Sequence, residues 1–172
     1  TTMDQELTLH TGFDALAHAI EAYVSNASSA LTDLNAIRAV QIIEKNLIPA
    51  IQNPLNMEYR NQMMLGSLLA GMAFSNASLG MTHAMAHALG GLKDSMHGIC
   101  NAILLDHVID FNYDFASQKY DEIGRALGLR PESVHKNERK NLLLEKIRLI
   151  KHQTGIHMSL KDLGIESKDF SG

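Results

Sequence analysis

The stretch Leu65-Gly-Ser-Leu-Leu-Ala-Gly-Met-Ala-Phe74 decides the fold class of this chain of 172 residues. It is apolar nearly all round and belongs to a longer helical pattern over residues 57–76. A helix that is hydrophobic on every side is stable only when other elements cover it. The stretch therefore predicts a central, buried helix that is surrounded by further helices.

Six more helices are predicted from apolar residues at steps of three and four and from capping and breaking residues. Their expected ranges are 11–24, 29–49, 81–89, 95–112, 115–127 and 131–153. A capping-box pattern at Thr11 opens the first of these helices, Ser29 or Thr32 opens the second, and Ser95 is the expected N-cap of the helix 95–112. The sequence contains no internal repeat and no alternating strand pattern of useful length. The expected fold class is all-α, a multi-helical bundle with short loops. The strongly charged helix 131–153 is either a separate subdomain or the solvated edge of one continuous bundle.

The composition excludes several classes of protein. With 45% hydrophobic and 20% charged residues the chain is globular, and its 5% aromatic content favours helices over a β-sandwich. The net charge of −4 and the lack of a basic run argue against a nucleic-acid partner. The single Cys100 excludes an internal disulfide, and no apolar run approaches the roughly 18 residues of a membrane span. We therefore expect a soluble, cytoplasmic protein.

Two pairs of polar side chains have the spacing of metal ligands. Asp14 and His18 are four residues apart, as are His83 and His87, so each pair shares one face of a helix. The first pair alone is also typical of a surface hydrogen bond. The second lies in an apolar helix, where an unpaired imidazole would cost about 1–3 kcal/mol. No Glu follows His83, which excludes the H-E-x-x-H protease motif.

A third candidate is His97, in the segment Ser95-Met-His-Gly98, where Gly98 allows a close approach of backbones. A lone histidine at such a place is otherwise a hydrogen-bonded loop residue. Together, one carboxylate and three imidazoles suit Fe²⁺ or Zn²⁺. A structural zinc site is usually rich in cysteine, and Cys100 alone cannot supply that, so the pattern favours a site that acts as a Lewis acid.

Three segments resemble the signatures of the iron-containing (group III) alcohol dehydrogenases. They are residues 12–23, 80–90 and 96–105, and a looser match extends to Gly155–Gly164, where His157 stands in place of the usual Pro. The resemblance implies the helical C-terminal domain of the dehydroquinate synthase-like fold. It also implies that the metal ligands are Asp14, His18, His83 and His97, and that His87 lies beside the metal as a proton relay or substrate contact.

The same resemblance implies a function. Residues 1–172 would be a single metal-binding domain of an NAD- or NADP-dependent alcohol dehydrogenase, which interconverts a small alcohol and its aldehyde or ketone by metal-assisted hydride transfer. The chain starts with Thr1 and has no G-x-G-x-x-G loop. We therefore expect a fragment without the N-terminal nucleotide-binding domain and the extreme C-terminus, inactive by itself and homo-oligomeric when complete. The nucleotide contacts are not assigned to any residue.

Two alternatives remain open. One is the domain of a glycerol-dehydrogenase-like or dehydroquinate-synthase-like zinc enzyme, and the other is a non-catalytic helical module that binds metal or a partner. Of the other residues, Cys100 is expected to be an inert core thiol, and Gly66, Ala70 and Gly71 to allow close helix packing. The methionines are expected mainly in the core, with Met81, Met85 and Met96 as alternative pocket residues. The histidines expected in solvent are His10, His135, His152 and His157, and His107 has no assigned partner.

Overall fold

The computed structural model describes residues 3–93 and 97–166, and every regular element within them is helical. This confirms the all-α fold. The α-helices are α1 (Gln5–Val24), α2 (Ala30–Gln52), α3 (Met57–Ala77), α4 (Met81–Lys93), α5 (His97–Asn112), α6 (Ser117–Ala126) and α7 (Arg139–Gln153). Short 3₁₀ turns precede α6 and α7. The predicted N-cap Ser95 and the candidate pocket residue Met96 lie outside the described residues.

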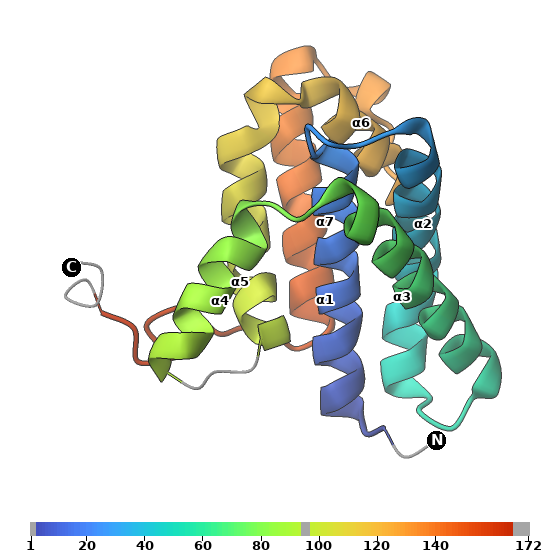
Figure 1. Ribbon diagram of the computed structural model, residues 1–172, viewed down its shortest axis with the longest axis vertical. Helices are drawn as coiled ribbons and strands as arrows, with labels where there is room; N and C mark the ends of the chain where they lie inside the picture. The colour runs from blue at the N-terminus through green and yellow to red at the C-terminus, as the bar shows by residue number, and fades with distance from the viewer. Residues whose placement is uncertain (1–2, 94–96, 167–172) are drawn as a thin grey trace.

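Helix α1 is the centre of the molecule. It packs against α2, α3, α5 and α6, and Figure 1 shows its blue ribbon between α7 on one side and α2 and α3 on the other. Phe13, Leu16 and Ile20 are almost completely buried, and the small residues Ala15, Ala19 and Ala22 let the neighbouring helices come close. Because α1 is enclosed from several sides, a polar side chain on one of its covered sides must find its partners inside the protein.

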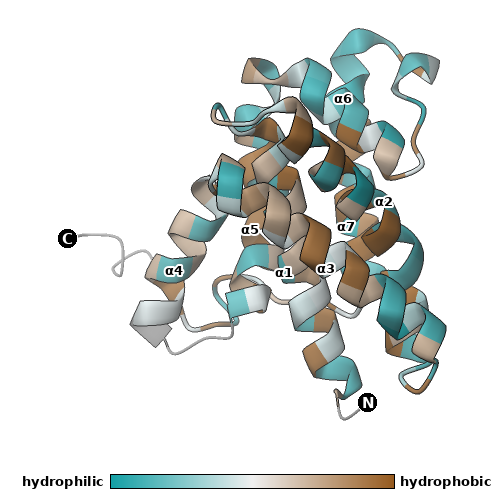
Figure 2. Cartoon of the chain, turned by 45° about the vertical axis from the view of Figure 1, so that its right-hand side comes forward, coloured by the Kyte–Doolittle hydropathy of each residue, from teal (hydrophilic) through white to brown (hydrophobic). Residues whose placement is uncertain are grey.

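Helix α3 is therefore not the central helix, and this prediction was wrong. Its buried side is a stripe of mostly small residues that packs on α1 and α2, whereas Met64, Leu65, Leu68 and Met72 are exposed. Figure 2 shows brown residues along the outer side of α3. Apolar composition on all sides made the helix look enclosed, but the neighbours cover only the side that allows the closest approach. Gly66 belongs to that side, since an added Cβ would lie 2.8 Å from Ile43.

Three helix boundaries differ from the sequence-based expectation. Helix α1 begins at Gln5, with the Asp4 carboxylate accepting from the Leu7 amide at 2.7 Å, so Thr11 and Asp14 are interior residues and not a cap. Helix α4 continues through Gly90 and Gly91 to Lys93, because a glycine inside a helix costs only about 1 kcal/mol. Helix α7 begins at Arg139, after the short turns that replace its predicted start at Pro131.

The other boundaries agree better with the pattern. Ser29 and Thr32 form the capping box of α2, which continues past Pro49 and ends at Gln52. Helix α7 is not a separate subdomain, because Leu143, Leu144, Ile147 and Ile150 join the same apolar core as α1 and α2. A second, smaller core joins α4, α5 and the C-terminal turns through Ala86, Leu89, Cys100, Leu104 and Ile165.

Several single-residue predictions can be compared with the structure. Cys100 is completely buried, as expected, but His10 is also buried and was wrongly placed in solvent. The methionines are not mainly in the core: Met63 is buried, and the exposed ones are Met3, Met57, Met64, Met72, Met81, Met85 and Met158. Gly71 does not serve close packing, because an added Cβ would meet nothing within 4 Å. His107, His135, His152 and His157 are exposed.

No single helix within the described residues is long and apolar enough to cross a membrane. By length and composition, α3 and the first part of α4 reach that threshold only as a pair, with a bend of 100° between them.

Helix α5 approaches the backbone of α1 at Gly98. A Cβ at this position would lie 2.3 Å from the carbonyl oxygen of His10, a distance that no side chain tolerates. The close backbone approach that the sequence predicted at Gly98 is thus confirmed, and the approaching backbone is that of α1.

We expect Gly98→Ala to lower the free energy of unfolding by about 1–3 kcal/mol, because the added methyl group meets a backbone atom that cannot move alone. Gly71→Ala is the matched control: it adds the same methyl group to open space and should be neutral or stabilise by up to about 1 kcal/mol. Urea denaturation of both variants measures the difference. Equal stability of the two variants would show that α5 can shift away from α1 at little cost.

An ion-pair cluster joins α5 to α7. Asp106 is 3% exposed and accepts hydrogen bonds from Lys151 Nζ at 2.7 Å and from Arg148 Nε at 2.9 Å. Burial alone would raise the pKa of Asp106, but the hydrogen bonds from Lys151 and Arg148 outweigh it and hold the pKa below its usual value. The ionised carboxylate therefore stabilises the folded state.

Asp106→Asn should lower the free energy of unfolding at pH 7 by about 1–3 kcal/mol, since it weakens two hydrogen bonds to cations. A lowered carboxyl pKa stabilises the fold above the pKa of the unfolded chain, and this contribution is lost as pH falls through the folded-state pKa. The gap between wild type and variant should therefore shrink from pH 7 to pH 3 in urea titrations. Asp110→Asn, which removes the half-exposed pair with Lys140, should leave the stability nearly unchanged. A gap that is independent of pH would contradict the role of the ionised carboxylate.

Candidate metal centre

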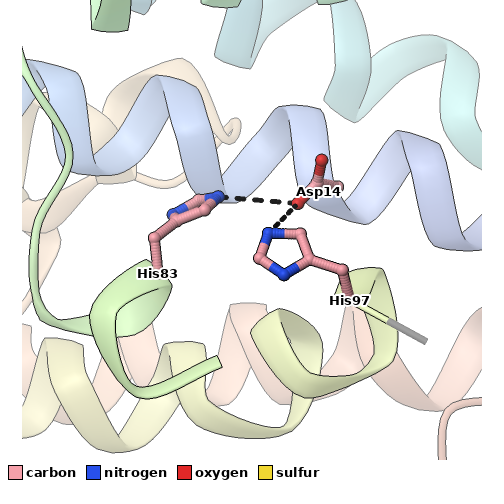
Figure 3. Close-up of side chains that lie close together, drawn as sticks. All are labelled: Asp14, His83 and His97. Carbon is pink, nitrogen blue, oxygen red and sulfur yellow. Dashed lines mark ion pairs between the residues drawn. The ribbon is translucent and has the colours of Figure 1, made fainter. Parts of the chain in front are cut away.

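Three of the predicted ligands converge where α1, α4 and α5 meet. The Asp14 Oδ1 atom lies 3.5 Å from His83 Nε2 and 3.5 Å from His97 Nε2. All three atoms lie within 4.8 Å of one another. Figure 3 shows the carboxylate of α1 facing the two imidazole rings, which come from α4 and α5. Residues that are 83 positions apart in the chain are therefore brought to one point by the packing of three helices.

The local structure explains how each side chain reaches this point. Asp14 is in the middle of α1, on the side that α5 covers, and is 25% exposed. His83 is in the first turn of α4 and is almost completely buried. His97 is the first residue of α5, next to Gly98, and its 37% exposure leaves the centre open on this side. The site is thus closed around His83 and accessible around His97.

His18, the fourth predicted ligand, lies beside the centre but is not among the converging atoms. Its ring stacks between Phe74 and His83, with centroid distances of 4.4 Å and 4.2 Å. Its Nδ1 atom lies 3.5 Å from Asp14 Oδ2, the carboxylate oxygen that does not contact the other two histidines. The expected one-turn neighbourhood of Asp14 and His18 is present, but the imidazole is engaged in stacking.

His87 lies on the exposed side of the same centre. Its ring centroid is 4.7 Å from that of His97, and its side chain is exposed. None of its nitrogen atoms belongs to the converging group among the described residues. His87 is therefore a neighbour of the converging side chains, and its role beside a metal stays a prediction.

The structure adds Glu21, which the sequence analysis did not single out. Its carboxylate is 4% exposed and accepts from the amides of Gly80 at 3.1 Å and Thr82 at 2.6 Å. Its Oε2 atom also lies 2.7 Å from His83 Nδ1. Glu21 comes seven residues after Asp14, two helical turns along the same side of α1. That spacing, on the side of α1 that carries Asp14, is the signal that could have identified it.

Asn101 is the second residue that the sequence did not reveal. It is completely buried, and its Nδ2 donates to Asp14 Oδ1 at 2.6 Å. The same nitrogen lies 3.1 Å from His83 Nε2 and 3.0 Å from His97 Nε2. Its Oδ1 is buried without a hydrogen-bond partner among the described residues. Asn101 follows His97 by one helical turn, which is the i,i+4 spacing that was applied to the two other pairs.

The electrostatics of the centre favour positive charge. Burial alone would lower the pKa of His83, but hydrogen bonds to Asp14 and Glu21 outweigh it and raise the pKa to about 9. Burial raises the pKa of Asp14, but its contacts with His83, His18 and Asn101 bring the net value below normal. Burial lowers the pKa of His18 to about 4, and burial with the neighbouring His83 and His87 lowers that of His97. Two rings are thus neutral at pH 7, with lone pairs available.

These residues fit a divalent cation. Ligands about 2.1 Å from a tetrahedral ion lie about 3.4 Å from one another, close to the 3.5 Å between Asp14 Oδ1 and each of the two imidazole nitrogens. The atoms that converge are a carboxylate oxygen and two imidazole nitrogens, the donors that Zn²⁺ and Fe²⁺ accept. In the structure, the Asn101 Nδ2 atom with its two hydrogens lies beside these three atoms. A bound ion would contact all three atoms at once.

Comparison with known proteins gives a consistent result. Residues 8–172 match the model "Fe-containing alcohol dehydrogenase family, C-terminal". The chain is 42% identical over 164 residues to a 1,3-propanediol dehydrogenase of Citrobacter freundii, with 95% of this chain and 42% of the relative covered. It is 39% identical over 167 residues to a lactaldehyde reductase of Escherichia coli K12, with 97% of this chain and 43% of the relative covered.

Solved structures share the fold. The crystal structure of a 1,3-propanediol oxidoreductase superposes with a TM-score of 0.95 at 40% identity, covering 98% of this chain and 44% of that one. An alcohol dehydrogenase from Oenococcus oeni superposes with a TM-score of 0.94 at 36% identity, with the same coverage. The chain therefore spans less than half the length of the relatives that it matches.

Asn101→Ala should destabilise the metal-free chain by about 1–3 kcal/mol, because it removes the hydrogen bond to Asp14 and leaves the acceptor atoms without this donor. Zinc should recover much of this loss, since an ion takes over the contacts that the amide makes. Thermal unfolding with a chelator and with Zn²⁺ measures both effects. Cys100→Ala is the control, because its buried thiol packs in the smaller core and its loss should be the same under both conditions. Equal stabilisation of wild type and Asn101→Ala by zinc would refute this interpretation.

Proposed function

Since the chain belongs to the Fe-containing alcohol dehydrogenase family, we propose that it forms the metal-binding part of an NAD(P)-dependent alcohol dehydrogenase. The reaction is the interconversion of a small alcohol and its aldehyde or ketone. Relatives named 1,3-propanediol dehydrogenase and lactaldehyde reductase support a short-chain substrate. The proposal includes a nucleotide site held mainly by a part of the enzyme that this chain does not contain, a homo-oligomer, and a cytoplasmic location.

The convergence of Asp14, His83 and His97 is the observation that carries this proposal. We assign these three side chains as ligands of a divalent ion, Fe²⁺ or Zn²⁺. His18 is proposed as the fourth ligand, which requires its ring to leave the stack with Phe74 and His83. Its neutral imidazole and its contact with Asp14 support this assignment.

A bound divalent ion supplies Lewis-acid chemistry that makes an alcohol hydroxyl easier to deprotonate. The chain's own residues supply the rest. Asp14 offsets part of the ion's charge, and the almost completely buried His83 closes the centre to water on one side. The open side, next to His97, is where an alcohol can enter. His87, exposed beside His97, is in position to carry the hydroxyl proton to solvent through its imidazole nitrogens.

Metal content and activity test the proposal directly. The chain, purified without oxygen, should bind close to one equivalent of Fe²⁺ or Zn²⁺ by elemental analysis, and Asp14→Ala or His97→Ala should lower this content. The complete product of the gene should oxidise short alcohols with NAD⁺ or NADP⁺, whereas the 172-residue chain alone should not. Metal binding without activity in the complete product would instead support a non-catalytic module, and no specific binding would end the proposal.

The two histidines of α4 should respond differently to substitution. In the complete gene product, His83→Ala should lose metal and activity together, because it removes a buried ligand. His87→Ala should keep most of the metal while turnover falls by about 10²–10⁴-fold or its pH profile shifts, as is usual for a positioned acid–base group. His152→Ala, an exposed histidine on α7, is the control and should change neither quantity. Equal metal loss in His87→Ala and His83→Ala would contradict these assignments.

A further inference from the structure

Glu21 contacts the one nitrogen of His83 that faces away from the metal centre. The His83 Nδ1 atom lies 2.7 Å from Glu21 Oε2, whereas the Nε2 atom lies 3.5 Å from Asp14 Oδ1. An imidazole that binds a metal keeps one proton and offers the lone pair of its other nitrogen. The shorter contact places that proton on Nδ1, which leaves Nε2 for the ion.

The carboxylate of Glu21 is itself held in place. Its Oε1 accepts from the Thr82 amide at 2.6 Å, and its Oε2 accepts from the Gly80 amide at 3.1 Å. These amides belong to the start of α4, whose first turn also carries His83. Gly80 allows this approach, since an added Cβ would lie 3.0 Å from Glu21 Oε1. With 4% exposure, the carboxylate has little access to water and cannot turn to another partner without losing these bonds.

We propose that Glu21 is a positioning residue of the metal centre: in the metal-loaded centre, where the ion takes the place of the second ring proton, it holds the His83 ring in the form protonated at Nδ1 and so directs Nε2 toward the ion. The inference rests on the metal site proposed above. A carboxylate that accepts from a ligating imidazole fixes the ring's orientation and raises the basicity of the ligating nitrogen, and removal of such a partner usually weakens metal binding by 10–100-fold. The backbone bonds to α4 make the same carboxylate a link between α1 and the helix that carries His83.

A purely structural role predicts different results. If Glu21 only caps α4, its substitution lowers the stability of the fold, but the folded molecules bind metal as before. If it positions His83, metal affinity falls even where the protein is fully folded. Gln is the closest substitute in shape, but it carries no charge. It also has one acceptor oxygen in place of two, so it cannot satisfy both the amides of α4 and His83 Nδ1.

The experiment uses Zn²⁺ as the probe and has two readouts. The dissociation constant for Zn²⁺ is measured by competition with a chromophoric chelator, at a temperature where each variant is folded by circular dichroism. Glu21→Gln should raise the constant by about 10–100-fold. Asp106→Asn is the matched control, because it removes another buried carboxylate, on the side of α5 that faces α7, and should destabilise the fold without changing zinc affinity. Unchanged affinity in folded Glu21→Gln would overturn the inference.

The second readout does not depend on a variant of Glu21. Long-range ¹H–¹⁵N spectra of the zinc-loaded wild-type chain should show His83 protonated at Nδ1 and bound to zinc through Nε2, with the signal assigned by its absence in His83→Gln. Protonation at Nε2 would overturn the inference, whether or not Glu21→Gln folds. Failure of the underlying proposal is recognised by a different result. If the wild-type chain binds no Zn²⁺, both the proposed metal centre and the proposed role of Glu21 are wrong.

Discussion

A carboxylate that is wholly or largely shielded from water must be paired, and in this protein two of them lie on the same helix. Asp14 and Glu21 belong to α1, which is covered by neighbours along most of its length. Burying an ionised group without partners costs far more than a single folded domain can offset. The two side chains therefore determine what must lie opposite them: the imidazoles of His83 and His97, the amide of Asn101 and the amino-terminal backbone of α4. The placement of α4 and α5 on α1 follows from this requirement together with the contact at Gly98.

Much of the fold could be predicted from the sequence because its signals are local. Steps of three and four between apolar residues identified all seven α-helices of the described residues, and Ser29 with Thr32 predicted the start of α2 correctly. The choice of the central helix failed, because the pattern of α3 reports its hydrophobicity but not which elements cover it. Stretches of small residues such as those of α1 decide how closely helices approach, and this depends on partners that lie far away in the sequence.

The candidate site, like the fold, could be predicted only in part from the sequence. Asp14, His83 and His97 could be proposed from spacing and from a resemblance to a family, and the structure brings them together. Asn101 and Glu21 also have helical spacing from His97 and Asp14, but spacing alone did not single them out, because an amide or an acid on a helix has many possible partners until the tertiary contacts are known. His18 has the expected spacing, yet its ring stacks on Phe74 and His83, which are distant in the sequence. Periodicity predicts on which face of a helix a side chain lies, but it does not predict which rotamer that side chain adopts.

The separate apolar core beneath α4 has a kinetic consequence. Helix α4 packs mainly on α5 and the C-terminal turns, through a cluster distinct from the large core around α1. Proteins open in cooperative units, and a unit with few apolar contacts opens with a lower free energy than the whole molecule. Detachment of α4 would break the bonds of Glu21 and carry His83 away from Asp14, while the bundle of α1, α2 and α3 stays intact. An ion held here could then exchange with solution through brief excursions of one helix, at a rate set by local unfolding instead of global denaturation.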